Sequence, residues 1–372
     1  MRTDWRLIGL LYLVGLFAAG QFAKIALTLD ALAIKYPGSA VPFAVSAVSL
    51  AGILFGVTAG MVVARFGART VLLTALFAAA FSSVAQSWLP EFPLFMSLRV
   101  FEGFCHLAIV VASPTLMAAV SRGRDVPIAM GLWGTFFGVG FAAAAAVIPL
   151  FDGASEVYFA HGVFGFVLLN LLWPLVPRGQ DRVLWDGNII AKHIAIYSSP
   201  RLVAPALSFF WHTVMFLGLL TFYPNFLGAW TAPILPLLAL VGTFGAGWLA
   251  RWFLPRDILL VGFGASILLL GLGLLVPDAL HVWVVMAAMI VIGLVPGASF
   301  ANVPALNLNG ADRARANGAI AQLGNIGTAT SVPLFASVLS YGFAGLTVAG
   351  MAISVLGALL VWLIHKRIAK SA

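Results

Sequence analysis

Residues 42–89 read PFAVSAVSLAGILFGVTAGMVVARFGARTVLLTALFAAAFSSVAQSWL. Two apolar runs, each of about the 20 residues that cross the hydrocarbon core of a bilayer, flank a short turn with Arg65 and Arg69. In hydrocarbon every backbone amide must be satisfied within its own segment, so such runs predict helices and not barrel strands. This stretch therefore predicts a helical hairpin that crosses a membrane twice.

The rest of the chain continues this pattern. It is 62% hydrophobic and 9% charged, whereas a soluble domain has roughly 45–50% apolar and about 25% charged residues. We predict an all-α polytopic membrane protein with twelve transmembrane helices, over residues 7–30, 42–64, 70–89, 93–120, 127–150, 158–176, 200–228, 232–254, 257–277, 280–306, 316–340 and 343–364.

The charges predict how the helices are oriented. Of the 20 Lys and Arg residues, only Lys35 lies in the breaks on one side and only Lys24 and Arg99 lie inside spans; the others fall on the opposite side. Such an excess marks the cytoplasmic side, where an even number of spans also places both termini. We expect a multi-pass protein of the cytoplasmic membrane. Since the basic residues are spread over many short breaks, the net charge of +8 does not indicate a nucleic-acid partner.

The longest polar break, residues 177–199, divides the spans six and six. We therefore expect a six-helix bundle over residues 1–176, a cytoplasmic linker over 177–199 and a second six-helix bundle over 200–372. The turn GMVVARFGAR (60–69) has a counterpart, GWLARWFLPR (247–256), close to half a chain length later. Weak internal repetition of this kind is typical of transporter folds.

The turn at 60–69 resembles the loop signature of the major facilitator superfamily, Gly-x-x-x-Asp-Arg-x-Gly-Arg-Lys/Arg. The match covers Gly60, Arg65, Gly67 and Arg69, which we take as a gating loop, while alanine stands at the acidic position 64 and at position 68. In the family the acidic residue helps to latch the outward-facing state. Without it, the latch is either missing or made by Arg65 and Arg69 on carbonyls at helix C-termini.

Two further stretches are similar to the same family. RVFEG (99–103) matches its Arg-x-x-x-Gly pattern in the fourth helix, and GLWGTFFGVG (131–140) resembles the glycine-rich fifth helix of its drug–proton antiporters but lacks their Gly-Pro step. The resemblance implies two six-helix pseudo-repeats that move a small molecule by rocker-switch alternating access. It also implies a monomer in the lipid bilayer that is not an enzyme, with no cofactor and with the proton gradient as driving force.

Charged residues inside a membrane indicate a functional site by default. The first half contains Lys24, Arg99, Glu102 and His106; the last three share one helix face at i, i+3 and i+7. If spans one and four line the cavity, as in the resembled fold, Lys24 and Arg99 bracket Glu102. Either Glu102 is only a counter-ion for two buried cations, or a cation holds an anionic substrate while Glu102 and His106 carry a proton.

The second half offers neutral candidates for the cavity. They are His212, Tyr223, Gln322 and Asn325, of which the last two are neighbours on a helix surface. Such a pair either lines a cavity or holds helices together through hydrogen bonds. Neither half contains a metal-binding cluster of Cys and His or a phosphate-binding loop.

Our main hypothesis is proton-coupled transport of a small organic anion or zwitterion, since two cations and one carboxylate leave a surplus of one positive charge. The alternative is a proton-antiport exporter of drugs or metabolites, in which Glu102 would alternate between a proton and a cationic compound. A third reading, a non-transporting membrane sensor, would need a signalling domain or a catalytic set, and neither is evident in the sequence.

Overall fold

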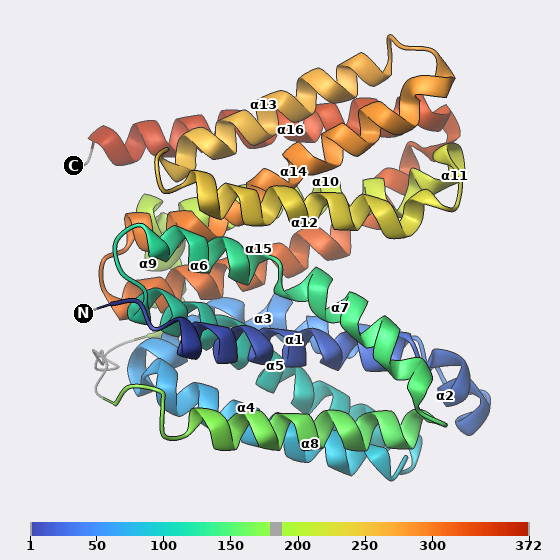
Figure 1. Cartoon of the computed structure of the whole chain (residues 1–372), viewed down its shortest axis with the longest axis vertical. Coiled ribbons are helices and arrows are strands. Elements are labelled where there is room, and N and C mark those ends of the chain that lie inside the picture. The colour runs from blue at the N-terminus through green and yellow to red at the C-terminus, as the bar shows by residue number, and fades with distance from the viewer. Residues whose placement is uncertain (1, 179–187, 371–372) are drawn as a thin grey trace. The chain divides into compact units, whose positions relative to one another are not determined.

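The computed structural model describes residues 2–178 and 188–370, and every regular element in these two ranges is a helix (Figure 1). Residues 179–187 of the predicted linker lie outside the described part. In chain order the elements are α1 (Trp5–Ala26), α2 (Leu29–Lys35), α3 (Phe43–Phe66), α4 (Ala68–Ser87), α5 (Phe92–Val120), α6 (Asp125–Gly134), α7 (Phe136–Val147), η1 (Ile148–Leu150), α8 (Ala154–Leu172), α9 (Ile189–Ser198), α10 (Pro200–Phe222), α11 (Pro224–Leu227), α12 (Thr231–Leu249), α13 (Pro255–Gly273), α14 (Asp278–Leu306), α15 (Gly310–Ser337), η2 (Leu339–Tyr341) and α16 (Gly342–Lys370).

Each of the twelve predicted segments coincides with helix, which confirms the fold class. Ten helices in the described part are long and apolar enough to cross a membrane, and the pair α6 and α7–η1, bent by 46°, would form an eleventh span. The remaining predicted segment, 316–340, falls in α15. This helix has 28 residues and is long enough to cross a membrane. Its sequence is too polar for it to be counted among the candidate spans.

Local sequence features set the helix ends. The Asp4 carboxylate caps α1 by accepting a hydrogen bond from Leu7 N at 3.0 Å. Gly67 separates α3 from α4 with φ 83°, a backbone conformation that an L side chain adopts only with strain. The turn of the hairpin at 60–69 therefore depends on this glycine.

The chain forms two compact units. The first contains residues 1–122, 136–191 and 309–322. In it α4 packs between α5 and α8, while α1 lies against α5, α7 and α8 and α3 lies against α5 (Figure 1). This arrangement brings α1, α4, α5 and α8 together around the charged residues of the first half.

The second unit contains residues 123–135, 192–308 and 323–372. Its central helix is α14, which contacts α6, α10, α12 and α13, and α16 covers α10 and α13 (Figure 1). α6 and the start of α15 thus group with helices from the other half of the chain. The predicted bundles, 1–176 and 200–372, are continuous stretches of the chain, whereas each compact unit combines several stretches. The predicted division stays a prediction.

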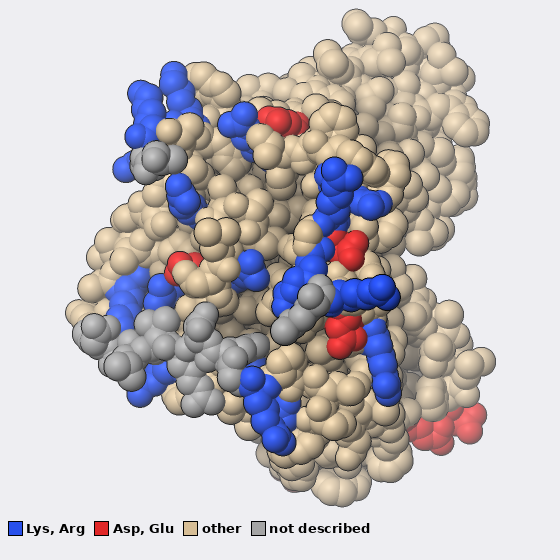
Figure 2. All heavy atoms as spheres, turned by 60° about the vertical axis from the view of Figure 1, so that its left-hand side comes forward, with Lys and Arg blue, Asp and Glu red and all other residues tan. Residues whose placement is uncertain are grey.

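Figure 2 shows many Lys and Arg side chains, with few Asp and Glu among them, on the face that it turns toward the reader. The orientation of the helices in the membrane stays a prediction.

Glycines allow the helices of the second unit to approach closely. A Cβ atom at Gly242 of α12 would overlap Ile290 O of α14, and one at Gly293 of α14 would overlap Ala239 O of α12. By contrast, a Cβ at Gly245, also on α12, would meet nothing within 4 Å. Close backbone contact between small residues is a main source of helix association in membranes.

We predict that Gly242→Ala lowers the stability of the purified protein by about 1–3 kcal/mol, because the added methyl group forces α12 and α14 apart. Gly245→Ala on the same helix is the control and is expected to leave stability unchanged or raise it slightly. Thermal unfolding of the two variants in one detergent measures the difference. Equal melting temperatures would contradict the close α12–α14 contact.

Candidate functional site

A carboxylate lies between two cations inside the first unit. Glu102 Oε1 accepts a hydrogen bond from Lys24 Nζ at 2.7 Å, and Glu102 Oε2 pairs with Arg99 Nη1. Gln86 Nε2 donates to the same Oε2 atom at 2.8 Å. Lys24, Arg99 and Glu102 are at most 1% exposed. The structure therefore brings three of the four predicted charged or titratable residues of the first half into one buried ion triad.

The other polar atoms of the two cations also have partners. Arg99 Nε donates to Ala44 O at 3.1 Å and Arg99 Nη2 to Gln21 O at 3.0 Å. Lys24 Nζ donates to Ser83 Oγ at 2.8 Å and lies 5.4 Å from the ring centre of Tyr158. The triad is thus tied to α1, α3, α4 and α8 as well as to α5.

The triad carries a net charge of +1, since two cations face one carboxylate. A charge in hydrocarbon costs at least about 2.5–3.5 kcal/mol on insertion scales. Pairing and hydrogen bonding reduce this cost, but removal of one partner leaves an uncompensated buried charge. Glu102 is the critical member because two cations depend on it.

Ser83 links the triad to a histidine. Besides accepting from Lys24, Ser83 Oγ donates to Tyr158 O at 2.9 Å and lies 3.0 Å from His161 Nδ1. His161 Nε2 lies 2.9 Å from Phe17 O, and the two rings are stacked at 4.2 Å. His161 is half-buried, whereas the triad is fully buried.

His106, the fourth predicted residue, lies beside the triad. Its Nδ1 is 3.0 Å from Gln21 Oε1 and 3.2 Å from Ala18 O, and its ring meets Phe22 edge-on at 5.0 Å. Among the described residues no chain of hydrogen bonds between side chains joins His106 to Glu102. Its role in proton transfer stays a prediction.

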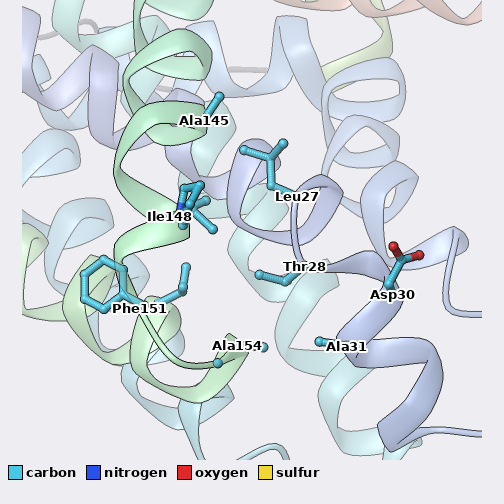
Figure 3. A pocket seen from close by; sticks show the side chains of 11 residues that line it. Leu27, Thr28, Asp30, Ala31, Ala145, Ile148, Phe151 and Ala154 are labelled. Atoms are coloured by element: carbon cyan, nitrogen blue, oxygen red, sulfur yellow. The ribbon is translucent and has the colours of Figure 1, made fainter.

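A shallow pocket opens at the end of this unit opposite Arg65 and Arg69. Its volume is about 360 Å³, and Figure 3 shows Thr28 and Asp30 on one side with Ile148 and Phe151 on the other. The Thr28 hydroxyl lies 2.8 Å from Tyr158 OH and donates to Lys24 O at 2.5 Å. Thr28 thus lines the pocket and contacts Tyr158, whose ring lies against Lys24 Nζ.

The second unit places two predicted cavity residues among apolar side chains. His212 on α10 is 5% exposed and stacks on Phe216 at 4.9 Å. Tyr223 is fully buried at the end of α10, where its hydroxyl lies 3.1 Å from Thr347 Oγ1. These contacts favour a packing role for Tyr223.

Gln322 on α15 holds two helices together. Its Nε2 donates to Ile53 O at 2.8 Å, its Oε1 accepts from Val57 N at 3.4 Å, and both partners lie on α3. These contacts favour the second of the two roles that the sequence left open, and cavity lining by Gln322 stays a prediction. Asn325 is half-buried one turn further along, in the second unit.

The gating loop contributes helix-end contacts. Arg69 donates to Trp173 O at 2.7 Å and to Val176 O, which are carbonyls just beyond the end of α8. Arg65 is exposed with its guanidinium 5.3 Å from the ring centre of Phe66. Gly60 lies against α15, where an added Cβ would meet Ala314 O and Arg315 Cα. Arg69 thus makes the kind of contact with helix-end carbonyls that the sequence analysis considered for a latch.

A polar shell that was not predicted from the sequence surrounds the triad. It consists of Gln21, Ser83, Gln86, Tyr158 and His161. Ser83 and Gln86 stand three residues apart in a mostly apolar span, which places them on one helix face. That spacing was the available signal. Nothing in the sequence indicates that this face turns toward Lys24 and Glu102. Among the described residues no three His, Cys, Asp or Glu side chains form a group that could hold a metal ion.

Comparisons with known proteins agree with this architecture. The sequence model of the Major Facilitator Superfamily matches residues 10–331. Human "Solute carrier family 22 member 12" is 30% identical over 165 residues, which are 44% of this chain and only 26% of that protein's length. The structure is similar to the proton:xylose symporter XylE (TM-score 0.76, 16% identity, 96% of this chain and 95% of that one). It is also similar to the E. coli fucose:proton symporter FucP (TM-score 0.75, 14% identity, 96% and 97%).

We predict that Glu102→Gln destabilises the protein by about 3–5 kcal/mol, because Lys24 and Arg99 are left buried without a counter-ion. Adding Lys24→Met to this variant should restore part of the loss, since one uncompensated charge is removed. Thermal unfolding of the two single variants and the double variant forms a double-mutant cycle. Asp257→Asn, which breaks the exposed pair with Arg256, is the control and should cost less than about 1 kcal/mol. A loss no larger than in this control would contradict the triad.

Proposed function

Because the chain belongs to the major facilitator superfamily, whose sequence model matches most of its length, we propose that it is a proton-coupled carrier of a small organic anion. As a member of this family it is a multi-pass membrane transporter of a small molecule and not an enzyme. The buried ion triad is the observation that supports proton coupling and an anionic substrate. Two cations share a single carboxylate there, so any group that replaces the carboxylate must also be an anion.

In this proposal a solute anion takes over the charge of the Glu102 carboxylate, and this replacement couples solute binding to proton uptake. When Glu102 takes up a proton it becomes neutral and no longer compensates Lys24 and Arg99. A monoanionic solute then restores the original balance: the site carries +1 with ionised Glu102, and +1 with protonated Glu102 and one bound monoanion. Since the charge of the site is the same in both states, one proton and one monoanion move together without extra charge in the membrane.

The sealed geometry of the triad is consistent with a resting state. Each guanidinium nitrogen of Arg99 and both oxygens of Glu102 have protein partners, so a solute would have to displace these partners while Glu102 is ionised. Protonation removes the strongest of these interactions. We propose that this step couples solute binding to alternating access, with Arg69 on the carbonyls near α8 as part of the cytoplasmic latch.

The positive charge of the site argues against the alternative, a proton-antiport exporter of cationic drugs, because a cation would add to an existing surplus. The solved relatives are symporters of protons with xylose and fucose. At 14–16% identity the similarity shows a shared fold and not a shared substrate. We therefore include sugars in the test but do not infer that this protein transports one. We also propose that both termini are cytoplasmic, because the Lys and Arg residues outside the predicted spans lie almost entirely in the breaks on one side.

The test is thermal stabilisation of the purified protein by a panel of organic anions, zwitterions, amines, sugars and lipophilic cations. A compound that binds the native state raises the melting temperature by mass action. We expect organic anions to stabilise the wild type and Lys35→Met, which changes an exposed lysine, but not Lys24→Met. Stabilisation by amines or lipophilic cations alone would favour the exporter, and stabilisation by sugars alone would refute an anionic substrate.

We further predict that anion affinity rises as pH falls, by at most about tenfold per pH unit, because binding takes up one proton. In Glu102→Gln, which mimics the protonated acid, affinity should no longer depend on pH, and the anion should recover much of the lost stability. Titration of the melting temperature against anion concentration at two pH values measures both effects. An unchanged pH dependence in Glu102→Gln would remove Glu102 from the coupling.

A further inference from the structure

A continuous chain of hydrogen-bonded side chains leads from Glu102 toward the edge of the buried region. It runs from Glu102 Oε1 to Lys24 Nζ (2.7 Å), to Ser83 Oγ (2.8 Å) and to His161 Nδ1 (3.0 Å). Glu102, Lys24 and Ser83 are buried completely, whereas His161 is half-buried. His161 is thus the least buried member of this chain.

The contacts of His161 define its tautomer. Phe17 O is a carbonyl and only accepts, so His161 Nε2, at 2.9 Å, carries the hydrogen. In the neutral ring Nδ1 is then an acceptor, and it lies 3.0 Å from Ser83 Oγ, whose one hydroxyl hydrogen is donated to Tyr158 O at 2.9 Å. Protonated Nδ1 would donate to Ser83 Oγ, which can accept this bond while its own hydrogen stays on Tyr158 O.

We propose that Ser83 and His161 form the proton path of the triad, with His161 as the group that delivers a proton to Glu102 and takes it back. This inference rests on the proposed proton coupling. It differs from the prediction for His106, whose described contacts are Gln21 Oε1 and Ala18 O.

The transfer balances along the chain. Lys24 gives one proton to Glu102 Oε1 and becomes a neutral amine, because an ammonium group has no lone pair that could accept a proton. The Ser83 hydroxyl then turns from Tyr158 O to Lys24 Nζ and gives its proton there, while the His161 Nδ1–H bond breaks and a bond forms to Ser83 Oγ. At the end His161 is neutral and Glu102 is a neutral acid, while Lys24 is again an ammonium group and Ser83 a hydroxyl. Each step moves a proton between atoms already within hydrogen-bond distance, as efficient proton transfer requires.

The surroundings of His161 connect its charge to the triad. The charged groups that act on it are Lys24 of α1 and Arg99 and Glu102 of α5, while α4 presents the neutral Ser83. On α8 itself the nearest titratable side chain is Tyr158, one turn earlier, whose hydroxyl is turned to Thr28. A proton on His161 is therefore drawn to Glu102 and repelled by the two cations.

The path can be tested on the protein without any solute. Lys24 is buried, so its ammonium protons reach water only through neighbouring groups, and NMR on protein with isotope-labelled lysine in lipid nanodiscs measures their exchange. The chain contains few lysines, and Lys24→Gln identifies the Lys24 signal. We expect His161→Gln and Ser83→Ala to slow this exchange by about tenfold or more. Ser83→Thr, which keeps the hydroxyl, should retain the wild-type rate.

Ser87→Ala is the matched control, because Ser87 is also buried on α4 but its hydroxyl donates to Val84 O, away from the triad. The direction of the effect separates a relay from a structural role, since loosened packing around Lys24 would speed exchange and not slow it. If His161→Gln does not fold, Ser83→Ala breaks the same chain.

Unchanged or faster exchange in both variants would overturn the proposal. So would a slowing seen instead in Thr28→Val or Tyr158→Phe, which would place the proton entrance at the pocket of Figure 3. Since no solute is present, the result is independent of the anion panel. Exchange that depends on His161, without stabilisation by any anion, would leave the relay standing and refute the proposed substrate class.

Discussion

The first unit depends on one carboxylate. Glu102 neutralises Lys24 and Arg99, and neither cation could remain in a membrane interior without it. Because these residues come from α1 and α5, and Gln86 and Ser83 from α4, the same interaction that balances charge also fixes three helices against one another. Any event that changes the charge of Glu102 must therefore change the packing of these helices.

The second unit is stabilised differently. The ion pairs among its described residues, such as Arg256–Asp257 and His281–Asp278, lie at helix ends and not inside spans. Its helices are held by backbone approach at glycines, as between α12 and α14, and by apolar packing around Met215, Leu219 and Phe335. Among the described residues the charged side chains inside spans thus lie in the first unit. A change in protonation or the binding of an ion would therefore act mainly on that unit.

The sequence was sufficient for the helices and for the charged residues, because spans follow from length and apolarity and an acid or base in a span is rare. Pairing Arg99 with Glu102 followed from helix geometry, since they are three residues apart. Lys24 lies on a different span, so its position beside Glu102 could be predicted only from the resemblance to a known fold. Ser83 could not be predicted, because a serine in a span usually bonds its own helix. His161 lies inside the predicted span 158–176 and could have been selected by the same rule as His106, but nothing in the sequence shows that it faces Lys24 and Glu102. Only the packing of α4 and α8 shows that these two residues contact the triad and each other. Gln322 was predicted as a cavity residue, but its side chain forms hydrogen bonds to α3.

The polarity of α15 has a consequence for how the protein is made. This helix gains little from lipid, and its polar side chains find partners on helices much earlier in the chain. Gln322 bonds to α3 across 265 residues, and Asn317 donates to Thr115 of α5 across 202 residues. The nascent chain must therefore keep α3 and α5 accessible until α15 leaves the ribosome. Biogenesis of this unit ends with α15 and not with α8, so a truncated chain that stops before residue 309 would lack part of its first unit.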